Sequence, residues 1–200
     1  MDVYDAVVKR RSIRVFRDEA VPYDILEKCV SAARLAPSAM NRQLCEYVIV
    51  DDEKALARVL DSALMWAGSP KPKEGWLPQG RPTAYIVSLI NKKLAAEIGC
   101  GSRNTDFDAA LAMENMVLTA EGEGLGSCIM TGIDKERLRQ ALNIPPEYDI
   151  AMLLALGYPD EKVVVEESDG SVERWLDADG VRHVPKRKLK DIVHRNIFPA

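Results

Sequence analysis

The segment from Asp106 to about Glu121 restricts the choice of folds more than any other part of this chain. It is the longest helical pattern, and its apolar side chains are spread widely around the helix rather than along one stripe: Ala109, Ala110, Met113, Met116, Val117 and Ala120. A helix that is apolar over so much of its circumference must be covered on several sides. We therefore expect it at the centre of the fold, either in the core or at a subunit interface.

Two near-continuous apolar runs of strand length, Thr83–Ile90 and Ile150–Leu156, predict strands that are buried on both faces. Shorter strands are expected at Glu46–Asp51 and within Ser127–Gly132. Further helices are expected at Val3–Lys9, between Pro22 and Pro37, from the capping residue Asp52 to about Leu64, in a short piece that ends at Ile98, from the capping residue Asp134 to Leu142, and at Leu189–Arg195.

The segment Val163–Val184 differs from the rest of the chain. Three β-rich runs are separated by Asp169-Gly170 and Asp179-Gly180, which are hairpin turn signals. They predict an appended β-meander or an arm that clasps a second subunit. We expect one domain over residues 1–200, with this meander and a basic tail at 163–200.

Composition excludes several classes of protein. The formal net charge of −4 and the pI near 5.4 argue against a broad nucleic-acid surface. No apolar run reaches the ~20 residues of a membrane span, and the first residues lack a signal-peptide core. A metal site is not expected, because the cysteines and histidines have no ligand spacing; they are Cys29, Cys45, Cys100, Cys128, His183 and His194. These features favour a cytoplasmic protein with reduced thiols.

The five-residue stretch Arg10-Arg11-Ser12-Ile13-Arg14 contains three guanidinium groups and a hydroxyl, although the protein as a whole is acidic. Guanidinium forks donate pairs of charge-assisted hydrogen bonds, which suits a phosphate dianion. The alternative is a solvated basic turn whose charge complements the end of the first helix.

Two loops have polar or aromatic residues suited to a ligand. Residues 37–43 are a loop of small and amide side chains that is able to hydrogen-bond a neutral heterocycle; on these residues alone, a simple helix stop is the favoured interpretation. Residues 65–82 contain four prolines and two tryptophans, which is typical of a loop or lid. Trp66 and Trp76 either cover a bound ligand or anchor the loop to the core.

Together these pieces resemble the FMN-dependent nitroreductase family. The similarity lies in KRRSIRVF near the start, AARLAPSAMNRQ, ENMVLTAEGEGLGSCIMTG, LALGYP and the closing VPKRKLKDIVHRNIF. The five motifs occur in the family's order and cover nearly the whole chain, with residues 65–101 the weakest match. The resemblance implies an α+β fold with a mixed, mainly antiparallel sheet surrounded by helices. It also implies an interlocked homodimer with two FMN sites at the subunit interface.

The resemblance also implies which residues bind FMN. Arg10, Ser12 and Arg14 match positions that hold the phosphate and ribityl chain, and Arg11 matches a backbone contact in the same turn. A second loop would reach the flavin from the other subunit, through Pro37, Ser38, Ala39 and Asn41. A third segment would pass beside the ring with backbone groups facing it: Ile129, Met130, Thr131 and Gly132. A C-terminal basic pair would close on the phosphate, formed from Lys186, Arg187 and Lys188, and period-2 geometry leaves open which two.

Two departures from the family pattern affect the pocket near the ring. Gln43 is followed by Leu44 and Cys45, where many members have Pro-Trp, and Thr131 stands where many have an acidic residue. Because the phosphate positions match well, these changes bear on the acceptor more than on FMN binding.

The function that the resemblance implies is an NAD(P)H-dependent oxidoreductase. A hydride from NADH or NADPH would reach flavin N5 and pass to a small organic acceptor, a nitroaromatic, a quinone or an enone, in ping-pong turnover. Since the cofactor performs the chemistry, no residue is assigned as a catalytic acid or base. The alternatives are a related flavin enzyme, namely a reductive dehalogenase or a flavin-fragmenting enzyme, and a non-catalytic FMN-binding protein.

Overall fold

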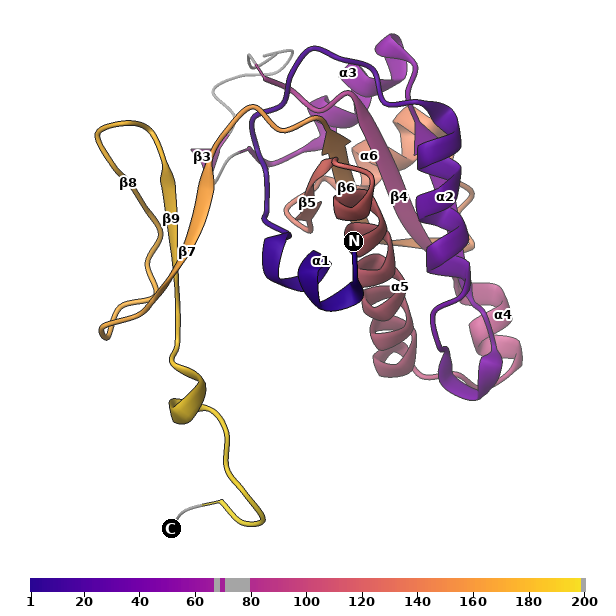
Figure 1. Cartoon of the computed structure of the whole chain (residues 1–200). Helices are drawn as coiled ribbons and strands as arrows, with labels where there is room; N and C mark the ends of the chain where they lie inside the picture. The colour runs from indigo at the N-terminus through magenta and orange to yellow at the C-terminus, as the bar shows by residue number, and fades with distance from the viewer. Residues whose placement is uncertain (67–68, 71–79, 199–200) are drawn as a thin grey trace. The chain divides into compact units, whose positions relative to one another are not determined.

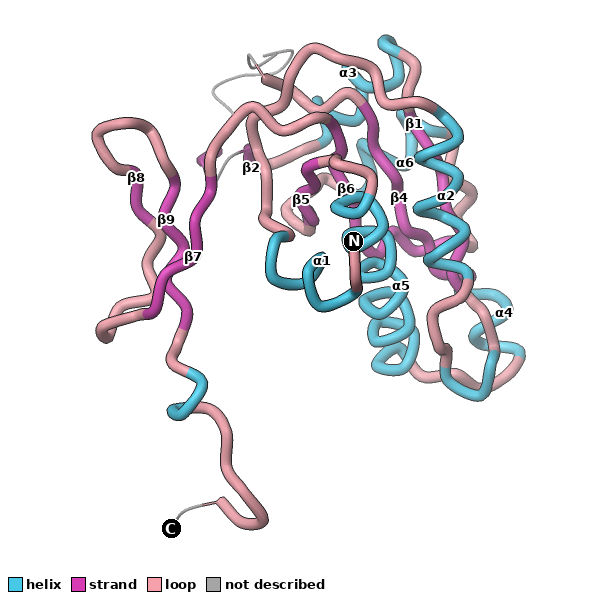
Figure 2. The backbone as a smooth tube through the Cα atoms, viewed as in Figure 1, coloured by secondary structure: helices cyan, strands magenta, loops and turns pink. Residues whose placement is uncertain are grey.

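The computed structural model describes residues 1–66, 69–70 and 80–198. They belong to two compact units, Met1–Asp160 and Glu161–Ala200, which are described separately. The boundary lies close to residue 163, where the appended segment is predicted to begin. Figures 1 and 2 show the elements of each unit.

The first unit contains a four-stranded sheet with every neighbouring pair antiparallel. Its strands lie in the order β1 (Cys45–Val50), β4 (Ala84–Asn91), β6 (Tyr148–Gly157) and β5 (Gly126–Met130). The two apolar runs of the sequence are the two central strands, and β4 is buried along all but its last residue. This antiparallel sheet with its helices is the α+β architecture expected from the sequence (Figure 2).

In the described residues, six α-helices accompany the sheet: α1 (Val3–Lys9), α2 (Tyr23–Arg34), α3 (Glu53–Ser62), α4 (Lys92–Glu97), α5 (Ser102–Gly122) and α6 (Lys135–Leu142). The predicted caps are confirmed, because the carboxylates of Asp52 and Asp134 accept hydrogen bonds from backbone N–H groups in the first turns of α3 and α6. Shorter pieces are the 3-10 turn η1 (Ala39–Asn41) and the paired strands β2 (Met65–Trp66) and β3 (Ser69–Pro70). The roles predicted for the tryptophan side chains at 66 and 76 lie outside the described part of the chain.

Helix α5 lies at the centre of the first unit, as its wide apolar surface predicts. It packs against α2 and the sheet, and one core cluster joins Leu26 and Cys29 of α2, Ile86 of β4, and Met113 and Met116 of α5. The helix begins at Ser102, earlier than the predicted Asp106. The reason is local, because Gly101 takes the extended conformation of a cap and the Thr105 hydroxyl donates to the Ser102 carbonyl.

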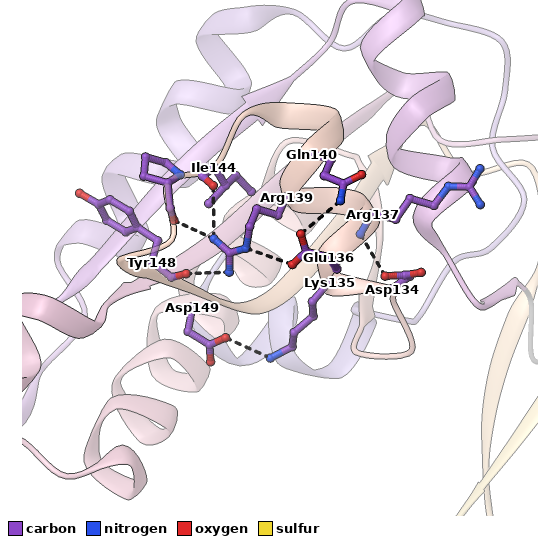
Figure 3. Close-up of polar contacts among 10 residues, drawn as sticks. Asp134, Lys135, Glu136, Arg137, Arg139, Gln140, Ile144, Tyr148 and Asp149 are labelled. Carbon is purple, nitrogen blue, oxygen red and sulfur yellow. Dashed lines mark hydrogen bonds and ion pairs between the residues drawn. The ribbon is translucent and has the colours of Figure 1, made fainter.

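The turn between α6 and β6 is held by one side chain. Arg139 donates to the carbonyls of Ile144 at 3.3 Å, Pro145 at 2.7 Å and Tyr148 at 2.9 Å, and it pairs with Glu136 at 3.7 Å (Figure 3). A guanidinium has enough donors to satisfy several carbonyls at once. This contact fixes the chain as it enters the second central strand.

The second unit contains three strands, in the order β7 (Val163–Glu167), β9 (Arg182–Lys186), β8 (Trp175–Leu176). Strand β7 pairs with β9 in parallel, and β8 pairs with β9 in antiparallel. A meander would pair β7 with β8, but these two strands are not neighbours, so that part of the prediction is wrong. The final helix is also shorter than predicted, a 3-10 turn at Leu189–Asp191.

His183 ties these three strands together. Its Nδ1 lies 3.0 Å from Glu166 of β7, and its Nε2 lies 3.3 Å from Asp177, just after β8. The ring stacks on Trp175 with centroids 3.8 Å apart, and the Trp175 indole donates to Glu166 at 3.0 Å. The hydrogen bond to Glu166, together with that to Asp177, raises the pKa of His183 above the usual value of 6.5.

We predict that the second unit loosens as the pH rises through the raised pKa of His183. A pKa raised by folding means that protonated His183 contributes its full stabilisation below about pH 6.5, and that this is lost as the pH passes through the raised value. An NMR titration of the His183 ring should give a pKa above 6.5, and the Glu166→Gln variant should lower it. A wild-type value at or below 6.5 would contradict this pairing.

In the described residues, no helix has both the length and the apolarity needed to cross a membrane. The same residues contain no cluster of histidine, cysteine and acidic side chains suited to a metal ion. All four cysteines are free thiols.

Candidate functional site

The first part of the candidate site is the arginine turn, Arg10–Arg14, which follows α1. Arg10 ends the helix with extended backbone angles, φ −52° and ψ 131°. The chain then runs along the edge strand β5: Ser12 forms a parallel bridge with Ser127, and the Ile13 N–H donates to the Ser127 carbonyl at 2.8 Å. The turn is thus fixed to the sheet by backbone contacts.

Three glycines leave room for the chain as it leaves the arginine turn. A Cβ on Gly126 would lie 2.8 Å from the buried side chain of Ile13, and one on Gly157 would lie 2.9 Å from the Phe16 ring. Gly80, at φ +68°, accepts a hydrogen bond from the Phe16 N–H at 2.9 Å. These close approaches require glycine, and they set the position of the turn on the strand.

The guanidinium groups of Arg10 and Arg11 are partly withdrawn from water and lack full hydrogen bonding among the described residues. The Nε atoms of Arg10 and Arg11 are buried and have no hydrogen-bond partner among the described residues. Burial, together with the charge of Arg10, lowers the pKa of Arg11. Burial raises the pKa of the nearby Glu121, although the arginines oppose this shift. Unpartnered buried donors are unusual in proteins, so the turn has unused capacity to bind an anion.

The second part is the loop 37–43, which has a strained backbone. Three of its residues, none of them glycine, have left-handed conformations: Met40 at φ 54°, Asn41 at φ 56° and Gln43 at φ 52°. Such conformations cost of order 1 kcal/mol or more each and cluster at functional sites. A plain helix stop does not require three of them.

Two side chains hold this loop in place. Asp108 of α5 accepts a hydrogen bond from the Ala39 N–H at 2.9 Å, and the Ser38 hydroxyl accepts one from the Gln43 N–H at 3.1 Å. Pro37 and Asn41 are exposed. The loop therefore presents polar groups on a backbone that the central helix supports.

The third part is the end of β5 and the turn after it. Ile129 is 42% exposed and Met130 is buried, while Thr131 and Gly132 are exposed. Since β5 is an edge strand, some of its backbone groups are directed away from β6. The Gly132 carbonyl accepts from the Leu64 N–H at 2.9 Å, which fixes the turn. The arginine turn contacts β5 near its start, at Ser127, and this segment is the end of the same strand.

The C-terminal basic residues belong to the second unit. Arg187 donates to the Asp191 carbonyl at 2.9 Å, and Lys188 lies 3.4 Å from Asp169. In the part of the chain that the structure describes, the Lys186 ammonium has neither an ion pair nor a hydrogen bond. The meeting of these residues with the arginine turn remains a prediction, because the two units are described separately.

Two features of the site are absent from the sequence prediction. The close contacts of Gly126 and Gly157 depend on the fold, which a local pattern does not reveal. The second feature is Asp108, which holds the loop 37–43. An acidic residue within the apolar surface of the central helix is visible in the sequence and could have indicated this role.

The family comparison places most of the first unit in one family. Residues 7–158 match the family model described as "Nitroreductase family". Among curated relatives, a Thermus thermophilus protein named NADH dehydrogenase is 30% identical over 182 residues, covering 81% of this chain and 89% of the relative. An iodotyrosine deiodinase from Thermotoga neapolitana is 29% identical over 173 residues, covering 80% of this chain and 89% of the relative.

Solved structures give the same assignment. A nitroreductase family protein from Clostridium novyi NT superposes with a TM-score of 0.65 at 27% identity, covering 80% of this chain and 87% of that one. A protein from Desulfovibrio desulfuricans solved in complex with FMN has a TM-score of 0.70 at 22% identity, covering 100% of this chain and 99% of that one. At this identity the likeness supports the fold alone. The family match over residues 7–158 includes the arginine turn and all four strands of the main sheet, and this chain therefore belongs to the nitroreductase family.

Proposed function

We propose that this protein is an FMN-dependent oxidoreductase that transfers a hydride from NAD(P)H to a small organic acceptor. The observation that carries the proposal is the arginine turn, where the buried Nε atoms of Arg10 and Arg11 find no hydrogen-bond partner in the described part of the chain. A phosphate dianion would supply the missing acceptors, and burying such a dianion unpaired would be prohibitive. Relatives named NADH dehydrogenase and NAD(P)H nitroreductase support the reaction class.

The residues present fit FMN. Arg10, Arg11, Ser12 and Arg14 would hold the phosphate and the ribityl chain. Bound FMN would supply hydride transfer between a nicotinamide and the acceptor. Ile129–Gly132 end the strand whose start the arginine turn contacts, and their backbone groups on the free edge suit hydrogen bonding to the edge of a flat ring. The unpaired ammonium makes Lys186 the preferred member of the C-terminal cluster for the phosphate, with Arg187 beside it.

A homodimer completes the site in this proposal. Pro37, Ser38, Ala39 and Asn41 would reach the flavin from the second subunit. Support comes from apolar side chains that stay exposed on α1 and α5, namely Val3, Tyr4, Val7, Val8, Phe107 and Leu111. A second subunit would cover side chains of this kind, since large apolar side chains are enriched where subunits meet.

Anaerobic reduction tests the proposal. Purified protein, reconstituted with FMN if necessary, should lose its oxidised-flavin absorption band when NADH or NADPH is added without air. A nitroaromatic, a quinone or an enone should then restore the band. Protein that stays colourless after reconstitution with FMN would contradict the proposal, and bound flavin inert to both nicotinamides would indicate a binding protein.

Reductive dehalogenation is the second candidate, because one relative is named iodotyrosine deiodinase. It uses the same cofactor and differs in the acceptor. Including iodotyrosine in the acceptor panel distinguishes the two, since a dehalogenase would release iodide while reoxidising the flavin. Failure of iodotyrosine with success of a quinone or nitroaromatic favours the first candidate.

A further inference from the structure

A cavity of ≈ 370 Å³ lies in the first unit, where α2, β1, α5 and the loop 37–43 meet. The larger part of its lining is apolar and includes Ala33 of α2, Leu44 and Ala112 of α5. Small-molecule sites have this character, an apolar enclosure with few polar groups. The volume is sufficient for a small organic molecule rather than for water alone.

One polar group in the lining lacks a partner. Asp108 is only 5% exposed, and its Oδ1 accepts from the Ala39 N–H. Its Oδ2 atom is buried and has no hydrogen-bond partner among the described residues. A buried carboxylate oxygen without a donor is costly, so a donor brought by a ligand would be favoured there.

The other polar groups that line the cavity, which include the exposed guanidinium of Arg34, do not supply that donor among the described residues. Burial raises the pKa of Cys45 to about 11 and raises that of Tyr47, so both are neutral near pH 7. Glu46 is already an acceptor, for the Tyr148 hydroxyl at 2.8 Å. Asp108 is thus the buried anionic acceptor at which a positive ligand group would gain most.

We propose that this cavity binds a small organic cation, whose ammonium or amidinium group donates to Asp108 Oδ2 while an apolar body fills the space between Ala33, Leu44 and Ala112. Neutral alcohols would donate more weakly, and carboxylates would be repelled. The cavity shares Pro37 and Ser38 with the loop proposed to reach the flavin, but its anchor, Asp108, is not among the proposed flavin residues. Its occupation can be measured without any redox reaction.

Benzylamine and benzoate form a matched pair of probes, since they share a phenyl group and differ in the sign of the charge. Isothermal titration calorimetry of the full-length protein near pH 7 should detect one benzylamine per chain and no benzoate. In the Asp108→Asn variant, affinity for benzylamine should fall by about tenfold or more, as expected for the loss of a charge-assisted hydrogen bond. The Glu46→Gln variant is the control, because it removes a lining carboxylate that already has a partner, and it should change affinity less than threefold.

A second variant tests the cavity independently of the carboxylate. Ala112→Leu would fill part of the space, and it should abolish benzylamine binding while circular dichroism shows the helices retained. The proposal is overturned if benzylamine produces no binding heat at millimolar concentration, if benzoate binds equally well, or if Asp108→Asn and Glu46→Gln have equal effects. These outcomes are measured as binding heat on flavin-free protein and require no redox reaction, so failure here is distinguishable from failure of the proposed oxidoreductase activity.

Discussion

Replacement of both Arg10 and Arg14 by alanine is expected to release FMN from a protein that remains folded. Each guanidinium would lose charge-assisted hydrogen bonds to the phosphate, and such bonds contribute about 1.5–3 kcal/mol each. Two of them correspond to a weakening of FMN binding of about 10²- to 10⁴-fold. The variant should be purified nearly colourless, and its FMN affinity is measured by quenching of flavin fluorescence.

Arg17 provides the matched control in the same segment. It is exposed, pairs with Glu19 at 3.2 Å and lies over the Tyr158 ring at 5.0 Å. Because a surface ion pair contributes little, Arg17→Ala should retain normal flavin. Normal occupancy in the double variant, with helical content unchanged, would show that the arginine turn is not the phosphate site.

The Gly126→Ala variant is expected to damage both stability and flavin binding. Its new Cβ would lie 2.8–2.9 Å from three atoms of Ile13, closer than side chains approach one another. Ile13 is 7% exposed and cannot turn outward freely. Overpacking of this kind costs about 1–3 kcal/mol. The displaced Ile13 would carry Ser12 with it, so the arginine turn would shift along β5.

Chemical denaturation measures the loss of stability, and the visible spectrum measures the loss of flavin. Combining Gly126→Ala with Ile13→Ala should recover part of the flavin occupancy, because the smaller side chain removes the collision. Gly122→Ala is the control, since nothing lies within 4 Å of its added Cβ and the site is helical. A Gly126→Ala protein as stable as Gly122→Ala would contradict the close packing described for this strand.

Many helix and strand positions in the first unit can be predicted from residues that are close together in the sequence. Asp52 and Asp134 mark helix starts, since their carboxylates cap the next turn. The strand from Thr83 to Ile90 is nearly all apolar, and it is buried because it lies between two other strands. In these segments the side chain that forms the contact lies within a few residues of the backbone it fixes.

The second unit shows where local chemistry is insufficient. Asp169-Gly170 and Asp179-Gly180 suggest turns, but a turn signal does not say which strand becomes the neighbour. Strand β9 pairs with both β7 and β8, and His183 makes contacts to both sides. That order depends on contacts between residues 17 positions apart, such as Glu166 and His183.

The candidate site combines both cases, since its residues are local in sequence but the contacts that fix them are not. The arginine turn is a run of five residues, so its charge is evident in the sequence. Its fixation is not, because Ser127 and Gly126 come from a strand more than 100 positions away. The left-handed conformations at Met40 and Gln43 also escape prediction, since neither residue type is usual there.

Binding of the phosphate by the arginine turn is tested most directly by titrating flavin-free, full-length protein with FMN and with riboflavin, which lacks the phosphate. We predict that FMN binds with one molecule per chain and at least about 100-fold more tightly than riboflavin, because the charge-assisted bonds to the phosphate are absent in riboflavin. Equal affinities for the two flavins would contradict the assignment of the arginine turn.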